Sequence, residues 1–271
     1  MRLIIFTNRD IASNLFLNHV LRQIAPYVVH IFVSDKVGKT TTADVPKELK
    51  DLKFFEQTLP NTIVFPLLDA QKRANTEGGK LMTFNELSRF YDLPIESLND
   101  VRSAESLAKI EALEPDLVLS VRYGKIFGNA FLKIPKRGVI NLHSGRLPQY
   151  RGVLPTFRAL MNGDTELYPT LHYIEDGTID TGGIIGSVAV PVQDKCLLGH
   201  ILDLYPHSVA LVASTIHQIA QGQKPLSDEQ PQSDAAYFTF PTHVEIDAFL
   251  EKTKREFVDV AEYMALLNQY V

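Results

Sequence analysis

The sequence contains a single cysteine, Cys196, among 271 residues. It can therefore form neither an intrachain disulfide nor a thiolate-rich metal site, and a reducing compartment suits it. No apolar run approaches the roughly 18–20 residues that a membrane helix needs. The apolar start, residues 1–6, is too short for a signal peptide and is followed at once by Asn8, Arg9 and Asp10. These absences predict a cytoplasmic protein with no membrane partner.

The chain also lacks a strong charge of either sign. Lys and Arg number 27 and Asp and Glu number 32, which gives a formal net charge of -5. This balance argues against nucleic acid or an anionic membrane as the main partner. With 45% hydrophobic and 22% charged residues, the chain can bury a sizeable core, so it is expected to form one large α/β domain with or without an appendage.

Short apolar runs alternate with helix-like segments along about the first 220 residues. Continuous apolar runs are typical of parallel strands buried on both faces. The segments that we predict as strands are residues 3–6, 28–33, 61–67, 117–121, 139–143, 170–174 and 183–192. The segments predicted as helices are residues 14–24, 82–91, 103–113 and 196–221, the last as two helices broken near Pro206. This alternation predicts an α/β fold with a doubly wound, Rossmann-like and mostly parallel sheet.

The composition changes after residue 221. Residues 222–235 are rich in Gly, Pro, Ser, Asp and Gln, and residues 237–240 form an aromatic patch. Thr242, with Glu245 three positions later, has the capping-box pattern that begins a helix. The apolar residues expected to pack in this tail are Ile246, Phe249, Leu250, Phe257, Val260 and Met264. We therefore predict a main domain over residues 1–221 and a short C-terminal appendage over residues 222–271.

A mixed-charge segment lies in the main domain. Residues 35–53 contain Lys together with Asp and Glu, and this mixture predicts a solvated loop and the exposed face of a helix.

Two polar side chains stand at the end of the predicted strand 139–143. Because side chains alternate along a strand, Asn141 and His143 point to the same face while Ile140 and Leu142 point into packing. Ligands of open α/β sheets bind outside the carboxyl ends of the strands. An amide and an imidazole side by side could bind a carbonyl oxygen on which charge develops, or could merely satisfy a polar strand end.

A second polar feature is Asp180, which lies between a loop containing Gly177 and a Thr-Gly-Gly turn. An aspartate there could cap a turn. It could instead accept a proton or orient His143, if the loop folds back over the strand end. His172, on the preceding predicted strand, could support the site from behind these residues or could be structural, and the structural interpretation is favoured.

Four stretches together resemble the folate-dependent formyltransferases, which include the glycinamide ribonucleotide, methionyl-tRNA and nucleotide-sugar enzymes. They are residues 138–143 (GVINLH), Leu147-Pro148 with Tyr150-Arg151-Gly152, Asn162-Gly163-Asp164, and residues 176–182 (DGTIDTG). Their order also resembles that of the family, with His143 and Asp180 separated by 37 positions.

The resemblance implies a reaction and a set of site residues. The family moves a formyl group from 10-formyltetrahydrofolate, a co-substrate, to a primary amine, and needs no metal. Asn141 and His143 match the pair that polarises the formyl oxygen, and Asp180 matches the aspartate that positions the histidine and water for proton transfer. The catalytic domain would then be residues 1–221.

The resemblance also implies where the folate is held. Residues 123–127, which include Tyr123, Lys125 and Ile126, resemble the segment that holds the pteridine through backbone and apolar groups. The loop with Asp176, Gly177 and Ile179 resembles the one that closes over it. Core packing is the alternative interpretation for Ile126 and its neighbour Phe127.

The acceptor side departs from the family pattern. Where the family has Pro-Ser-Leu-Leu-Pro after its histidine, this chain has Ser-Gly-Arg-Leu-Pro, so Arg146 could face a substrate anion or simply be exposed. Tyr150 and Arg151 are the other residues predicted to bind the acceptor.

The acceptor itself is predicted by elimination to be an amino sugar carried on a nucleotide. Residues 7–15 lack the glycines of a phosphate loop, which disfavours glycinamide ribonucleotide. The tail is too short and too little basic for a tRNA-binding domain. The alternatives that stay open are an amino-acid or hydroxylamine acceptor, formyltetrahydrofolate hydrolysis, a methionyl-tRNA formyltransferase-like protein, and a non-catalytic folate- or nucleotide-binding protein. Dimerisation through the tail also stays open.

Overall fold

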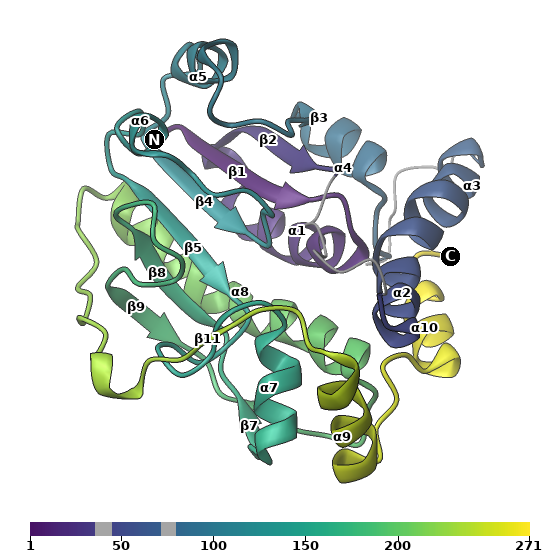
Figure 1. Ribbon diagram of the computed structural model, residues 1–271. Helices are drawn as coiled ribbons and strands as arrows, with labels where there is room; N and C mark the ends of the chain where they lie inside the picture. The colour runs from purple at the N-terminus through teal and green to yellow at the C-terminus, as the bar shows by residue number, and fades with distance from the viewer. Residues whose placement is uncertain (36–44, 72–79) are drawn as a thin grey trace.

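The computed structural model describes residues 1–35, 45–71 and 80–271, and its centre is a seven-stranded sheet (Figure 1). The order across the sheet is β3-β2-β1-β4-β5-β8-β9. The strands are β1 (Leu3–Asn8), β2 (Val28–Ser34), β3 (Ile95–Ser97), β4 (Leu117–Val121), β5 (Val139–His143), β8 (Thr170–Ile174) and β9 (Ile184–Ser187). Two small ribbons pair β6 (Arg151–Gly152) with β11 (Tyr237–Phe238), and β7 (Glu166–Leu167) with β10 (Val190–Pro191).

The first five strands of the sheet are parallel, and β8 and β9 are antiparallel to their neighbours. The parallel strands place their carboxyl ends at one edge, where Asn8 ends β1 and His143 ends β5. The predicted α/β fold with a mostly parallel, doubly wound sheet is confirmed. This edge is also where open α/β sheets bind ligands.

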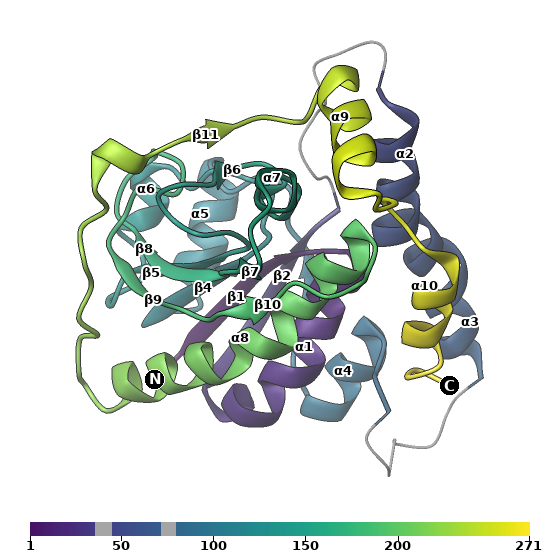
Figure 2. The same ribbon diagram turned by 90° about the horizontal axis from the view of Figure 1, so that it is seen from below.

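The helices cover both faces of the sheet (Figure 2). They are α1 (Ile11–Ile24), α2 (Lys47–Lys53), α3 (Phe65–Ala70), α4 (Phe84–Tyr91), α5 (Ala104–Glu111), α6 (Asn129–Leu132), α7 (Pro155–Asn162), α8 (Leu197–Ala220), α9 (His243–Thr253) and α10 (Val260–Leu267). The side chains of β1 alternate between two cores. Leu3 and Ile5 pack with α1 and α8 on one face of the sheet. Ile4 and Phe6 pack on the other face, which α5 and α6 cover. This alternation explains why β1 is apolar throughout.

Residues 61–67, which we predicted as a strand, are helical. A π-helical stretch, Pro60–Val64, runs into α3. Phe65 and Leu68 are buried, but Ile63 and Leu67 are exposed, so the segment is amphipathic with a helical period rather than buried on both faces. A short apolar run does not distinguish these two cases. Of the mixed-charge segment 35–53, residues 36–44 lie outside the described residues and Lys47–Lys53 form α2.

Two other predicted elements differ from the structure. Residues 183–192 form two strands, β9 and β10, rather than one. The segment 196–221 is one helix, α8, that continues through Pro206. A proline inside a helix costs about 3 kcal/mol. Burial of Leu202, Tyr205 and Val209, on both sides of Pro206, offsets this cost and keeps the helix continuous.

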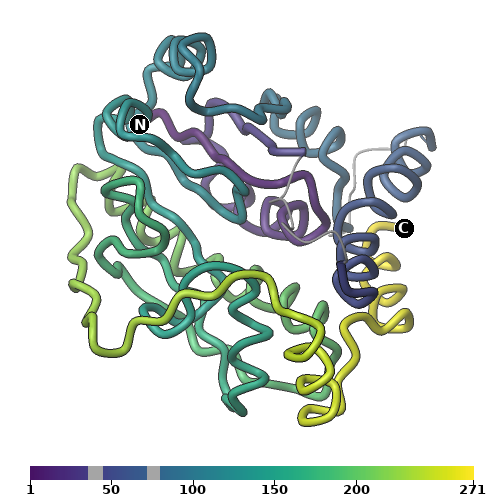
Figure 3. The backbone as a smooth tube through the Cα atoms, in the orientation of Figure 1, coloured from purple at the N-terminus to yellow at the C-terminus, as the bar shows by residue number. Residues whose placement is uncertain are grey.

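The C-terminal residues pack against the main core. Figure 3 shows the yellow-green chain before α9 crossing the front of the teal part of the backbone. Phe249 of α9 stacks on Phe157 of α7, with ring centroids 4.6 Å apart, and the Tyr270 hydroxyl donates to Asn14 Oδ1. Val260 and Met264 are more than half exposed, so their predicted packing was wrong.

The capping box predicted at the start of α9 is confirmed and is joined to α7 by an ion pair. Thr242 and Glu245 exchange the expected hydrogen bonds, and Arg158 Nη1 donates to the Glu245 carboxylate. The hydrogen bond from Arg158 outweighs partial burial and lowers the pKa of Glu245 from 4.5 to about 2. The pair therefore stabilises the fold above pH 4.5, and the stabilisation is lost as the pH falls toward 2.

We expect Glu245→Gln to lower the melting temperature at neutral pH, and this deficit to shrink as the pH falls from 4.5 to 2. Thermal melts monitored by circular dichroism across this range would measure it. Glu251→Gln, an exposed change on the same helix, is the matched control and should show no such trend. A deficit for Glu245→Gln that stays constant with pH would contradict this role for the ion pair.

Within residues 1–35, 45–71 and 80–271, no helix has both the length and the apolar character that crossing a bilayer requires. The same residues contain no group of three or more His, Cys, Asp or Glu side chains that could hold a metal ion.

Candidate active site

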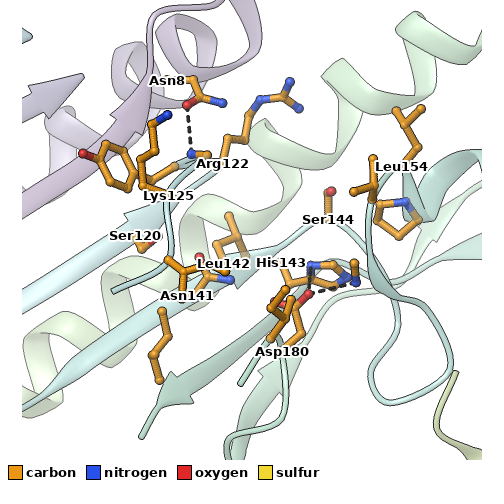
Figure 4. Close-up of a pocket in the computed structure, with 18 of the residues that line it drawn as sticks. Asn8, Ser120, Arg122, Lys125, Asn141, Leu142, His143, Ser144, Leu154 and Asp180 are labelled. Carbon is orange, nitrogen blue, oxygen red and sulfur yellow. Dashed lines mark hydrogen bonds and ion pairs between the residues drawn. The ribbon is translucent and has the colours of Figure 1, made fainter. Parts of the chain in front are cut away.

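A cavity of about 540 Å³ opens at the carboxyl edge of the parallel strands. Its walls come from the ends of β1, β4 and β5, from the segment 122–127 and from the loop 174–182 (Figure 4). Residues of α2 complete the wall. Tyr237 and Phe240, from the C-terminal residues, also line it. A volume of this size falls within the usual range for small-molecule sites, about 300–1,000 Å³.

Asn141 and His143 of β5 both line this cavity, as their alternation on the strand predicts. His143 is buried, and its Nε2 lies 2.7 Å from the carbonyl oxygen of Tyr150. A carbonyl oxygen only accepts hydrogen bonds, so Nε2 is the donor there. Nδ1 is then the ring nitrogen left to exchange a proton, and it faces Asp180.

The loop after β8 brings Asp180 back to the end of β5. The Asp180 Oδ2 atom lies 3.4 Å from His143 Nδ1 and accepts a hydrogen bond of 3.0 Å from the Gly152 N–H. Asp180 adopts the left-handed backbone conformation, with φ 55°. This strained geometry is uncommon for a residue other than glycine, and it turns the carboxylate toward His143.

The environment of Asp180 keeps its carboxyl group ionised. Burial by itself raises the pKa of this group, but the neighbouring His143 ring and the hydrogen bond from the Gly152 N–H oppose burial, and the pKa stays below its ordinary value of 3.8. The site therefore contains a carboxylate that is ionised at neutral pH beside the His143 ring. Such a charge stabilises a proton taken up by Nδ1.

His172, interpreted from the sequence as structural, belongs to the site. It pairs with Asn141 across the antiparallel β5–β8 ladder. Its Nδ1 donates to the Tyr173 carbonyl oxygen at 2.8 Å, so its Nε2 accepts from Asn141 Nδ2 at 3.1 Å. Asn141 thus has a fixed amide orientation and retains one N–H for a ligand. Only the antiparallel register brings the two residues together, and residue spacing alone does not reveal that register.

A buried charge cluster forms another part of the wall. Arg122 donates to Asp10 Oδ2 and to Glu56 Oε1, each at 2.9 Å, and to the Tyr205 hydroxyl at 3.0 Å. Arg122 follows β4 with φ 60°, and Asp10 caps α1 by accepting from the Ser13 N–H. The cluster therefore joins four segments of the chain: the start of α1, the helical stretch that follows α2, the end of β4, and α8. None of these four residues was predicted from the sequence to belong to a site.

Most of the residues predicted to hold folate lie at the cavity. Tyr123, Lys125, Ile126, Asp176 and Ile179 line it. Gly177 does not, although both of its neighbours do. Ile126 is 44% exposed and Ile179 is 37% exposed, so two large apolar side chains remain open to solvent here. The core-packing alternative holds for Phe127, which is 3% exposed and stacks between Tyr123 and Phe131.

The three residues predicted to bind the acceptor do not line the cavity. The Arg146 guanidinium lies 3.7 Å from the centroid of the Tyr168 ring. Tyr150 donates its hydroxyl to Asp164 and contributes only its carbonyl oxygen to His143. Arg151 is 8% exposed and donates twice to Gln230 Oε1, at 2.7 and 3.1 Å.

The sequence of this chain is similar to those of known formyltransferases. A sequence profile described as formyl transferase matches residues 56–201, just over half of the chain. A methionyl-tRNA formyltransferase of Syntrophomonas wolfei is 32% identical over 153 residues, which are 56% of this chain and 48% of that protein. One of Geobacter sulfurreducens is 35% identical over 131 residues, 48% of this chain and 41% of that protein. The chain thus spans about half the length of the curated relatives it matches.

Solved structures share the fold at low sequence identity. An N-formyltransferase from Helicobacter canadensis, in complex with folinic acid and dTDP-3-aminofucose, has a TM-score of 0.58 at 15% identity, covering 96% of this chain and 82% of that one. Glycinamide ribonucleotide transformylase 1 from Symbiobacterium toebii has a TM-score of 0.56 at 15% identity, covering 85% of this chain and 95% of that one.

Proposed function

The chain belongs to the formyl transferase family, and from this membership we propose that it transfers a formyl group from 10-formyltetrahydrofolate to a primary amine. The observation that carries the proposal is the convergence of Asn141, His143 and Asp180 on one cavity. Asp180 is 37 positions from His143 in sequence, yet its carboxylate lies 3.4 Å from the imidazole. A binding protein without catalysis would not require this arrangement.

The bound donor supplies an activated formyl carbon, whose oxygen gains negative charge as the amine attacks it. Asn141 has one amide N–H free of His172, and this N–H can stabilise that charge. His143 Nδ1 takes up a proton from the attacking amine and returns it to the departing nitrogen of the folate. Asp180 stabilises the positive ring between these two transfers. The new C–N bond forms, the old one breaks, and the proton is conserved.

The apolar end of the cavity suits the folate rings. Ile126 and Ile179 offer exposed apolar surface there, and residues 123–127 offer backbone N–H and C=O groups. A flat heteroaromatic ring would cover these side chains and remove their apolar area from water, at about 25 cal/mol per Å².

The acceptor that we propose is an amino sugar carried on a nucleotide. Lys50 and Lys53 of α2 line the cavity, and both can pair with phosphates. Tyr237, which is 54% exposed, can stack on a base. The Helicobacter canadensis enzyme, which shares the fold, was solved in complex with dTDP-3-aminofucose.

An aminoacyl-tRNA is the second candidate acceptor, because the curated relatives of this chain are methionyl-tRNA formyltransferases. Against it stands the net charge of -5. The two candidates differ in the ionic-strength dependence of binding, which is steep for tRNA because phosphate contacts release counterions.

Release of tetrahydrofolate, followed by absorbance, tests the proposal. The protein is mixed with 10-formyltetrahydrofolate and, in parallel, with nucleotide-linked amino sugars, methionyl-tRNA, free amino acids, or no amine. We expect release only with an amine, and fastest with a nucleotide-linked amino sugar. Release without any amine would favour the hydrolase, and no release with no folate binding would overturn the proposal.

A further inference from the structure

A segment of the C-terminal appendage holds the backbone around Asp180. We call residues 228–238 the C-terminal strap. At its start, Asp228 and Ile184 exchange backbone hydrogen bonds of 2.8 and 2.9 Å, which join the strap to β9. At its end, β11 pairs with β6, where Arg151 N–H donates to Ala236 and Val153 N–H donates to Phe238. The strap therefore spans the space between the two segments that bracket the Asp180 carboxylate.

Gln230 is the buried polar side chain of this strap, with 7% exposure. Its amide Nε2 donates to the carbonyl oxygens of Asp180 and Gly182, at 2.9 and 2.7 Å. Its Oε1 accepts two hydrogen bonds from the Arg151 guanidinium. One primary amide thus uses both its N–H groups and its oxygen to join two segments of the active site.

These contacts lie where the Asp180 backbone needs support. Asp180 has a positive φ, and residues 175–179 before it are exposed, so little packing holds this part of the loop. After it, Gly182 lies so close to Tyr173 that a Cβ would stand 2.0 Å from the Tyr173 carbonyl oxygen. The loop must therefore follow a narrow path, and hydrogen bonds to its carbonyl groups define that path.

Arg151 and Gly152, which form β6, act on the other side of the Asp180 carboxylate. Gly152, which donates its N–H to Asp180 Oδ2, directly follows Arg151. Gly152 has φ 95°, and a Cβ there would lie 2.2 Å from the Phe238 carbonyl oxygen of the strap. Gln230 thus holds the backbone of Asp180 through the Asp180 carbonyl oxygen. Through Arg151 it also holds the neighbouring Gly152, whose N–H orients the Asp180 carboxylate.

We propose that Gln230 is a positioning residue that, with Arg151, sets the Asp180 carboxylate against His143. Gln230 touches no reacting atom and acts only through Asp180 and Gly152. The strap lies outside residues 56–201, the part of the chain that the family profile matches. The catalytic part of this inference rests on the proposed formyl transfer, whereas the structural part does not.

We expect Gln230→Ala to lower kcat by about 10–100-fold, because small displacements of a catalytic group have effects of this order. KM for the folate donor should change little, since Gln230 does not line the cavity. Gln223→Ala is the matched control, a glutamine of the same appendage that is exposed, and it should keep the parental kcat.

Gln230→Glu separates positioning from stability. A glutamate can still accept from Arg151, but its ionised carboxylate has no N–H for the carbonyls of Asp180 and Gly182. We expect this variant to retain the melting temperature better than Gln230→Ala and yet to lose kcat to a similar extent. If it recovers both the melting temperature and kcat, Gln230 serves only as a partner for Arg151, and the proposal is wrong.

A substrate-free measurement keeps this inference distinct from the proposed function. The pKa of Asp180 can be followed by carboxyl ¹³C NMR, with Asp180→Asn identifying the signal. We expect the pKa to rise toward 3.8 in Gln230→Ala, because the carboxylate leaves His143 and Gly152. An unchanged titration would overturn the positioning role. A raised pKa in a protein that transfers no formyl group would support the positioning of Asp180 while refuting formyl transfer.

Discussion

His143→Ala is expected to lower kcat for formyl transfer by about 10²–10⁴-fold, the range in which a positioned acid–base group acts. The substitution removes the ring nitrogen that faces Asp180 at 3.4 Å and leaves the buried carboxylate without this partner. KM for the folate donor should change far less, because the apolar wall with Ile126 and Ile179 is untouched. Steady-state kinetics with the best amine would measure both constants.

Asn141→Ala is expected to lower kcat for formyl transfer by about 10²–10³-fold, because this is the common cost of removing one donor to a developing oxyanion. His207→Ala is the control, because His207 is exposed on α8, does not line the cavity, and donates its Nδ1–H to the Asp203 carbonyl oxygen. A kcat for His143→Ala close to that of His207→Ala would rule out the acid–base role assigned to His143.

Arg122→Met is expected to lower the free energy of unfolding by about 3–5 kcal/mol, the usual cost of removing one member of a buried ion pair. The Asp10 side chain is fully buried and that of Glu56 is 10% exposed, so neither carboxylate gains enough water to replace the guanidinium. Burial already raises the pKa of Glu56, although Arg122 opposes this shift. Without Arg122, the buried carboxyl groups of Asp10 and Glu56 would both lose the guanidinium that pairs with them.

Denaturant unfolding of the parent and the variant would measure this effect. Lys109→Met is the matched control, since Lys109 pairs with Glu96 where both side chains are more than a third exposed. Such surface pairs contribute about 0–1 kcal/mol. Similar losses for the two variants would contradict the view that the Arg122 cluster supports the cavity.

The sequence was sufficient for five strands of the sheet and for the placement of two polar side chains at the end of β5, but it missed β3 and predicted residues 61–67 wrongly as a strand. Apolar runs predicted β1, β2, β4, β5 and β8 because strands buried on both faces have no polar side. The alternation on β5 placed Asn141 and His143 on one face because it depends only on neighbouring residues. Local chemistry, such as the Thr242 capping box, was predictable for the same reason.

Residues that meet through tertiary structure were not predictable in this way. His172 reaches Asn141 only through the antiparallel register of β5 and β8. Arg151 lies in a motif next to the active site, and this position suggested acceptor binding. The folding back of the strap buries its guanidinium against Gln230, some 80 positions away, and nothing near Arg151 in the sequence indicates that partner.

Transfer of an isotopically labelled formyl group tests the central claim most directly. The parent protein and Asn141→Ala are incubated with 10-formyltetrahydrofolate labelled at the formyl carbon and with the amine that best releases tetrahydrofolate. We predict that the label appears on the amine nitrogen with the parent and appears about 10²–10³ times more slowly with Asn141→Ala. Label that stays on the folate, or that moves equally fast with both proteins, would contradict the assignment of formyl transfer to this cavity.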